Sequence, residues 1–172
     1  MSSDRIHRHN RVRNLLDKIC QEGMLSPVMD ADGRRPGDVT IPVWRANKGL
    51  AIDVAVTCPF NSHNLTCKAP CERYASSKKH AYYDEGFKGT AFEFAALILR
   101  QPEVLNEEGL GLLRQLFRFA AKHQGLQLSV YCGRAWARLS CSLQSSVSQC
   151  FLDRSGSLAA VEKDIDFVSV NF

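Results

Sequence analysis

The stretch RPGDVTIPVWRANKGLAIDVAVTCP, from Arg35 to Pro59, decides the fold of this chain. On each side of the polar segment RANKG, apolar residues recur at every second position. This period predicts two strands joined by a tight turn into a hairpin. The apolar positions expected to face the core are Val39, Ile41, Val43, Ile52, Val54 and Val56.

Two acids interrupt this apolar pattern, Asp38 and Asp53. Both fall in the phase opposite to the core positions, so pairing of the strands brings both carboxylates to one surface of the sheet. A charged group among valines and isoleucines is costly unless it is paired or holds a cation, and a divalent cation would remove the repulsion between two carboxylates. Ala51 and Ala55 leave room around Asp53. The pattern indicates a metal site; ordinary charges on the wet face of a sheet are the alternative.

Composition indicates a single globular domain, because the chain has 172 residues, of which 45% are hydrophobic and 23% charged. No apolar run is long enough to cross a membrane, so we expect no membrane partner. The first residues, MSSDRIHRHNRVR, lack the apolar core of a secretory signal. Seven cysteines without a tight framework are typical of a reducing compartment. We therefore expect an intracellular protein, in the nucleus or cytoplasm, that is not secreted.

Outside the hairpin, periodicity and helix-end signals predict further elements in chain order. They are a helix over 6–22, a short strand over 28–30, a helix over 72–86, a buried strand over 90–99, a helix capped by Asn106 and ended by Gly125, and a final helix from Val130. The period is lost at the end of the chain. We expect a domain over 1–154 and a poorly ordered tail over 155–172.

The loop after the hairpin contains residues that could bind zinc: His63, Cys67 and Cys71, with Cys58 before them and His80 after them. The closely spaced cysteine pairs of structural zinc sites are missing. We therefore expect unpaired cysteines here and no zinc centre; a small zinc-binding interaction domain is the alternative.

RPGDV, then AIDVAVT, then a lysine-bearing helix that ends in tyrosines, resembles the restriction-like endonuclease domain of non-LTR retrotransposons, a branch of the PD-(D/E)XK nuclease superfamily. RHNRVRNLL and RAWARLSCSLQSSVSQCFLDR resemble the flanks of this motif in retroelement-derived reading frames, so the resemblance covers residues 7–154. It implies a restriction-endonuclease-like α/β core, a central mixed sheet flanked by helices in the order α-β-β-β-α-β, plus C-terminal helices.

The resemblance also implies a catalytic site made of Asp38, Asp53 and Lys79, with the two carboxylates as metal ligands. The cofactor would be Mg²⁺ or Mn²⁺, because oxygen ligands suit such ions and the bound ion can orient an attacking water. The lysine would stabilise the phosphate oxyanion or help to activate the water. No small-molecule cofactor is implied.

Asp30, Lys78 and Tyr83 are accessory candidates. Asp30 could be a third acid at the same edge or only a residue that flanks a turn. On an α-helix Lys78 points about 100° away from Lys79, so only one of them can serve. We choose Lys79 because it lies four residues before Tyr83, as in the K-x-x-K-Y pattern of the family.

The chain departs from the family pattern at three places. Gly37 separates Pro36 from Asp38, Ala55 stands where the commoner form has lysine, and Tyr82 replaces the second lysine of K-x-x-K-Y. The chain also has no reverse transcriptase. It could be a fragment, a decayed copy, or a domain put to another use.

Basic residues near the two acids are expected to contact DNA, and the net charge of +4 is compatible with this. They are Arg8, Arg11, Arg34, Arg35 and Arg45. A solvated basic face is the alternative for the first helix. The sequence thus predicts a metal-dependent DNA endonuclease that makes nicks; the alternative is a catalytically inactive nucleic-acid-binding or structural module on the same fold.

Overall fold

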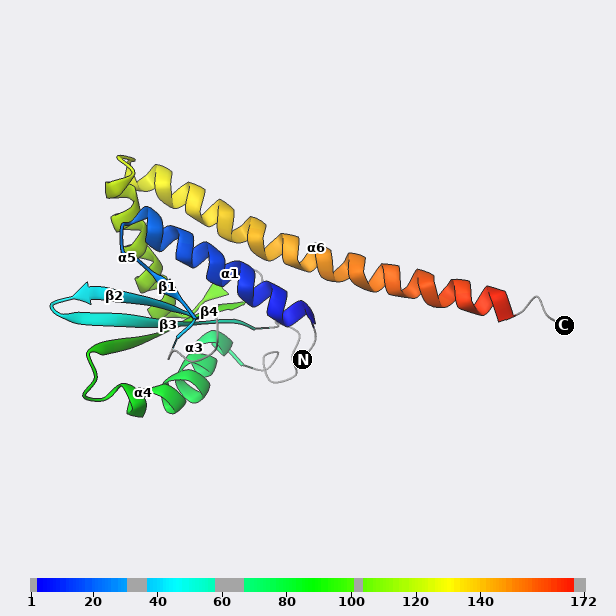
Figure 1. The fold of residues 1–172 in the computed structure, drawn as a ribbon, viewed down its shortest axis with the longest axis horizontal. Coiled ribbons are helices and arrows are strands. Elements are labelled where there is room, and N and C mark those ends of the chain that lie inside the picture. The colour runs from blue at the N-terminus through cyan, green and yellow to red at the C-terminus, as the bar shows by residue number, and fades with distance from the viewer. Residues whose placement is uncertain (1–2, 31–36, 58–66, 101–103, 169–172) are drawn as a thin grey trace.

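A five-stranded mixed sheet lies at the centre of the molecule, with helices against both of its faces (Figure 1). The computed structural model describes residues 3–30, 37–57, 67–100 and 104–168. The strands, in their order across the sheet, are β1 (Val28–Met29), β2 (Val39–Arg45), β3 (Lys48–Thr57), β4 (Phe92–Arg100) and β5 (Val104–Leu105). Strands β3 and β4 run parallel, and the other neighbours are antiparallel. The predicted α/β class with a mixed sheet is confirmed.

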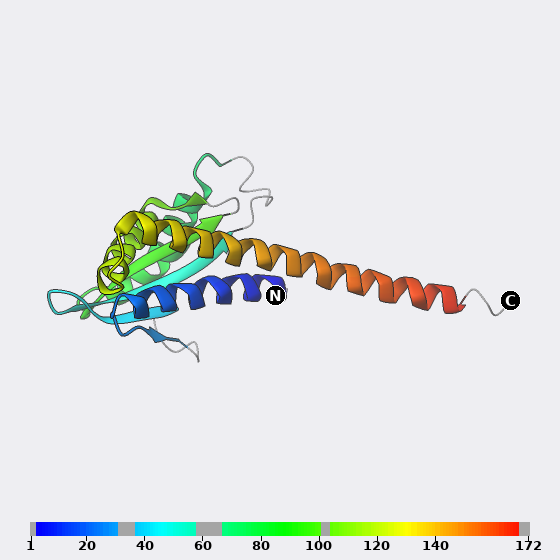
Figure 2. The ribbon, with the colours of Figure 1, turned by 90° about the horizontal axis from the view of Figure 1, so that it is seen from above.

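Three long helices cover one face of the sheet: α1 (Ser3–Glu22), α5 (Glu107–His123) and α6 (Leu128–Val168). Helices α1 and α6 run side by side in both views (Figure 2). The C-terminal end of α1 is hydrogen-bonded to α6, because the Glu22 carboxylate accepts hydrogen bonds from Arg138 and Tyr131. The main core lies between these helices and the sheet. The apolar residues of α1 that recur at helical spacing are buried in it: Val12, Leu15, Leu16, Ile19 and Cys20.

The predicted hairpin is confirmed as β2 and β3, with Ala46 and Asn47 at its turn. The inward position predicted for Val43 is wrong, because its side chain is 75% exposed. Pro42 has no amide hydrogen for the strand ladder, and the register of β2 against β3 shifts between Ile41 and Arg45. The alternation in β2 therefore holds only up to Ile41.

The other face of the sheet is covered by the helical crossover from β3 to β4. It consists of α3 (Pro70–Tyr74), the π-helical segment η1 (Ala75–His80) and α4 (Ala81–Phe87), which follow one another without a break. The helix predicted over 72–86 is therefore confirmed in extent, although its middle is not α-helical. Because the crossover returns the chain to the same end of the sheet, β4 can pair parallel to β3.

Asn106 precedes α5 as predicted, but its side chain does not cap that helix. Its Oδ1 accepts a hydrogen bond from the Ile98 N–H (2.9 Å), and its Nδ2 donates to the Ala96 carbonyl (2.8 Å). Strand β5 pairs with β4 only at its last two residues, Leu99 and Arg100. The fully buried amide of Asn106 therefore satisfies the next part of the β4 edge, which would otherwise be left unpaired.

Helix α6 is helical without interruption to Val168 and projects past the sheet in both views. We had expected a poorly ordered tail from residue 155 because the hydrophobic period is lost there. The segment SLAAVEKD contains several strong helix formers, which is consistent with a continued helical backbone. The domain boundary at residue 154 stays a prediction.

Candidate active site

Asp38 and Asp53 lie on neighbouring segments and on the same face of the sheet. Val39 pairs with Ile52, and the same antiparallel register carries Asp38, one residue before β2, opposite Asp53 of β3. The two segments are also joined directly, because the Val54 N–H donates a hydrogen bond to Asp38 Oδ2 (2.7 Å). Since Ile52 faces the main core, Asp53 points to the side of the crossover; Asp38 lies opposite it, just before β2, where His9 of α1 also reaches it. The common phase predicted from the alternation is confirmed.

Gly37 allows the segment before β2 to pass very close to β3. A Cβ at this position would lie 3.0 Å from both the backbone nitrogen and the backbone oxygen of Ile52. Contacts that short would force the two segments apart and would move Asp38 away from Val54. The glycine that separates Pro36 from Asp38 therefore has a structural reason.

Lys79 reaches the acids from the crossover. Its Nζ lies 2.6 Å from Asp53 Oδ2, and both side chains are largely buried, with 18% and 10% of their surface exposed. This oxygen has the ammonium beside it but no well-aligned hydrogen bond from the described residues. Lys78 is exposed. The structure thus brings Lys79, and not Lys78, to the carboxylate, as chosen from the sequence; the catalytic role of Lys79 stays a prediction.

The π-helical segment η1 carries both lysines. Its local cause is the pair Ser76 and Ser77, whose hydroxyls both donate to the Arg73 carbonyl (3.2 and 2.7 Å). In an α-helix that carbonyl would accept from the Ser77 N–H instead, so the serines compete with the α-helical pattern. Short π-helical turns occur often at functional sites, since they redirect the side chains that follow.

His9 of α1 is part of this cluster, and the sequence analysis missed it. Its Nε2 lies 3.1 Å from Asp38 Oδ2. The hydrogen bond to Asp38 raises the pKa of His9 above its ordinary value, against the opposing effect of burial. The position could have been found from the helical period, because His9 precedes Val12 by three residues and Leu16 by seven and so continues the buried stripe of α1.

The pKa values around the site follow from burial and from these contacts. Burial raises the pKa of Asp53, and the adjacent Lys79 reduces this effect without cancelling it. Burial lowers the pKa of Lys79, but the hydrogen bond and charge of Asp53 outweigh it and raise the pKa above the ordinary value. Lys79 therefore stays a cation at neutral pH.

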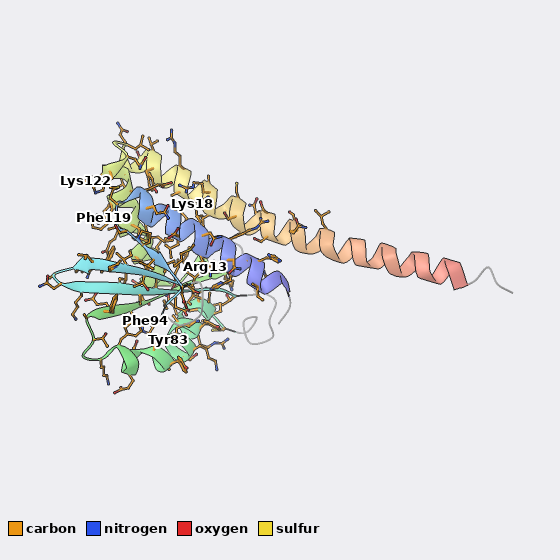
Figure 3. All side chains as sticks on the ribbon, in the orientation of Figure 1. Arg13, Lys18, Tyr83, Phe94, Phe119 and Lys122 are labelled. Atoms are coloured by element: carbon orange, nitrogen blue, oxygen red, sulfur yellow. The ribbon has the colours of Figure 1, made fainter. Side chains whose placement is uncertain are left out.

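Two accessory candidates adjoin the cluster. Asp30 follows β1, and its N–H donates to the Asp38 carbonyl (3.1 Å). The backbone of Asp30 therefore lies beside that of Asp38. Tyr83 lies with its ring centre 6.0 Å from Lys79 Nζ, and the ring of Tyr74 lies at the same distance. Figure 3 shows Tyr83 and Phe94 on the face of the sheet opposite to α1, the helix that carries Arg13 and Lys18.

The predicted DNA-binding arginines are not all brought together. Arg8 and Arg11 lie on α1 beside His9, and Arg11 is exposed. Arg45 is at the opposite end of β2 from Asp38, about 23 Å away at 3.3 Å per residue. There it donates to Gln115 Oε1 (2.8 Å), so it does not flank the acids. Arg34 and Arg35 lie outside the described residues.

Asp38 and Asp53 are the residues that could hold a divalent cation. Within the described ranges, no group of three or more histidine, cysteine or acidic side chains converges as a metal set. Two carboxylates are nevertheless what Mg²⁺ takes from many proteins, with water and substrate phosphates as its other ligands. The partly unsatisfied Asp53 Oδ2 fits such an ion. The donor set is therefore suited to Mg²⁺ or Mn²⁺.

Among the described residues, the zinc candidates Cys67, Cys71 and His80 belong to no group of three or more metal ligands. Cys67 and Cys71 are free thiols in the structure, while Cys58 and His63 lie outside the described residues. Within the described part of the chain, no helix has the length and apolar character needed to span a bilayer. A scan of the chain against protein-family models and a search of curated proteins both find no match.

Proposed function

We propose that this protein is a metal-dependent DNA endonuclease domain, derived from a retroelement, that nicks DNA with Asp38, Asp53 and Lys79. The observation that carries the proposal is the contact of Lys79 Nζ with Asp53 Oδ2 at 2.6 Å. The two residues come from different elements, and the complete β3–α3 connection separates them in sequence. A largely buried lysine held against the buried member of a pair of carboxylates is an arrangement suited to phosphoryl transfer.

The order of the elements supports the same proposal. A helix, α1, precedes three antiparallel strands, β1 to β3, and a helical crossover then leads to the parallel strand β4. This is the α-β-β-β-α-β order of the PD-(D/E)XK core that the sequence resembles. The proposal assigns the two acids to the β2–β3 hairpin and the lysine to the crossover that follows, as the resemblance implies.

The residues would divide the chemistry as follows. A divalent cation held by Asp38 and Asp53 would orient the attacking water and neutralise charge on the phosphate. The Lys79 ammonium can donate to the phosphate oxygen on which negative charge develops. His9 and the Val54 N–H keep Asp38 ionised and fixed in direction. The rings of Tyr74 and Tyr83 each lie 6.0 Å from the Lys79 Nζ, close enough to attract its charge.

Nicking of supercoiled plasmid DNA tests the proposal. With Mg²⁺ or Mn²⁺ the wild type should convert the supercoiled form to the open circle, and EDTA should stop it. Asp53→Asn and Lys79→Ala should each slow nicking by about 100-fold or more, since loss of one group that stabilises transition-state charge has effects of this order. Lys78→Ala is the matched control, because Lys78 is the exposed neighbour, and it should retain most of the activity.

Two outcomes would overturn this assignment. If Lys79→Ala nicked as fast as the wild type, the catalytic role of the lysine would be wrong. If the wild type bound DNA but stayed inert with both metals, the catalytically inactive nucleic-acid-binding module would replace the nuclease. Thermal unfolding during a Mg²⁺ titration gives an independent measure, because an ion that binds only the folded protein raises its Tm.

A further inference from the structure

A row of aromatic rings leads from Lys79 to the surface of the protein. The ring of Tyr83 lies 6.0 Å from Lys79 Nζ, and the ring of Tyr82 lies 4.9 Å from that of Tyr83 at an angle of 89°. Beneath them Phe94 of β4 contacts Tyr83 at a ring distance of 4.9 Å and Phe87 at 5.4 Å. Only one ring, that of Tyr83, therefore separates Tyr82 from the lysine of the candidate site.

Tyr82 is 77% exposed, which is more than any other large hydrophobic residue in the described part of the chain. The ring of Tyr82 nevertheless has an edge contact with the ring of Tyr83, which itself packs on Phe94 of the sheet. An exposed aromatic side chain on a fixed support loses little conformational freedom when a flat ligand stacks on it. The ring of Tyr82 is thus an exposed surface on which a flat ligand could stack, next to the proposed phosphodiester site.

One exposed cation near Tyr82, Lys78, is available to an anionic ligand. The two acids of α4 are already paired: Asp84 contacts His80 at 2.8 Å, and Glu85 contacts Lys88 at 2.6 Å. Lys78 is exposed on the neighbouring turn and has no ion pair with another described residue. A ligand with a flat ring and a negative charge would therefore meet an aromatic ring and a free cation on this surface. A nucleotide has both features.

We propose that Tyr82 stacks on an unpaired base of the strand whose phosphate lies at Asp53 and Lys79. The substrate is then DNA with a single-stranded or displaced stretch beside the scissile bond. In an intact duplex each base has neighbours on both of its faces, so a side chain cannot stack on it without unstacking the helix. Stacking on aromatic rings accepts any base and gives strong binding to single strands. This inference rests on the proposed nuclease function and adds its substrate class.

Binding without cleavage tests the inference. Fluorescence anisotropy in EDTA compares a labelled single-stranded oligonucleotide with a blunt duplex of the same sequence. Tyr82→Ala should weaken binding of the single strand by roughly tenfold or more. It should change binding of the duplex much less. Tyr82→Phe keeps the ring and should bind like the wild type. Val43→Ala, at an equally exposed position on the hairpin, is the control and should change neither affinity.

A second measurement reports the stacking itself. The fluorescence of 2-aminopurine placed in the single strand should fall when the wild type or Tyr82→Phe binds, and should stay high with Tyr82→Ala. If Tyr82→Ala bound the single strand as well as the wild type, or if the wild type preferred the blunt duplex, the inference would be wrong. If only the stacking proposal is wrong, the wild type still nicks DNA in the presence of metal. If the nuclease proposal is wrong, the wild type is inert on every substrate.

Discussion

Asp38 and Asp53 lie opposite each other, yet their surroundings shift their pKa values in opposite directions. Burial raises the pKa of both carboxyls. At Asp38 the hydrogen bonds from His9 and from the Val54 N–H outweigh burial, so its pKa lies below the ordinary value. At Asp53 burial remains the larger effect despite Lys79. Asp53 is therefore the carboxyl that becomes protonated first as the pH falls, and its protonation would set the acid limit for binding of the proposed cation.

Replacing His9 should raise the pKa of Asp38. In His9→Ala the burial of Asp38 stays while its strongest opposing hydrogen bond is lost. A depressed carboxyl pKa gives stability that is present above the unfolded pKa and is lost as the pH falls through the folded pKa. His9→Ala should therefore begin to lose stability at a higher pH than the wild type. Carbon-13 NMR titration of the Asp38 carboxyl gives the pKa directly.

The control for this titration is His123→Ala, at an exposed position near the end of α5. It should leave the titration of Asp38 unchanged. An Asp38 pKa that is the same in His9→Ala and in the wild type would show that the contact at 3.1 Å has no role in setting the acidity of the site.

At the scale of elements, the crossover is held in place by contacts of His80, the residue that follows Lys79 in sequence. His80 contacts Asp84 of α4 and Glu108 of α5, each at 2.8 Å. Glu108 also accepts a hydrogen bond from the Ala96 N–H of β4 (3.2 Å). His80 thus links the segment that carries Lys79 to both α5 and the sheet.

This link should make stability depend on pH. Burial lowers the pKa of His80, but the bonds and charges of Glu108 and Asp84 outweigh it and raise the pKa. A raised pKa gives stability that is complete below the unfolded pKa and is lost as the pH rises through the folded pKa. His80→Gln should lower the Tm more at pH 5.5 than at pH 9. The difference should be under about 1 kcal/mol, because both partners are exposed to solvent.

Thermal unfolding across this pH range checks the expectation, with His123→Gln as the exposed control. If the Tm difference between His80→Gln and the wild type stayed constant from pH 5.5 to 9, the charged contacts of His80 would not contribute to stability.

Among the described polar residues, we expect Asn106 to be the one whose replacement lowers the stability of the fold most. Asn106→Ala would leave the Ile98 N–H and the Ala96 carbonyl buried without their partner. Each unsatisfied group costs about 1–3 kcal/mol, so for the two groups we expect a loss of about 2–6 kcal/mol in the free energy of unfolding. Urea denaturation measures it. Asn14→Ala, at an exposed position on α1, is the matched control and should change stability by less than about 0.5 kcal/mol. A loss as small as that of the control would contradict the role of the amide.

At the scale of the whole molecule, the positive charge that matters for DNA should lie at one end of the sheet. Duplex binding should weaken steeply with salt, because each phosphate contact contributes about 0.9 to the slope of log K against log salt concentration. Arg11→Ala, beside His9 on α1, should reduce that slope by about one contact. Arg45→Ala, at the far end of the hairpin, should leave it unchanged. A flat salt dependence, or equal effects of the two variants, would contradict this placement of the DNA.

The sequence by itself determined most of the elements and the phase of the two acids, but not β5, the π-helical turn or the extension of α6. Alternation along a strand is a local property, so Ile52 and Val54 fix the face on which Asp53 must emerge, and Val39 does the same for Asp38. The period of α1 is equally local and identified its buried residues. The prediction failed for Val43 because the position of the bulge after Ile41 depends on how Pro42 meets the partner strand.

Only the tertiary structure decided which distant groups meet the acids. The parallel pairing of β3 with β4 fixes where the crossover lies, and the serine-induced π-helical turn then aims Lys79 at Asp53. The packing of α1 on the opposite face brings His9 to Asp38. The buried amide of Asn106 became a strand partner for the same reason, since β4 needed one. Periodicity gives the direction of a side chain within its own element, whereas contacts between elements depend on how whole surfaces pack and on which backbone groups remain to be paired.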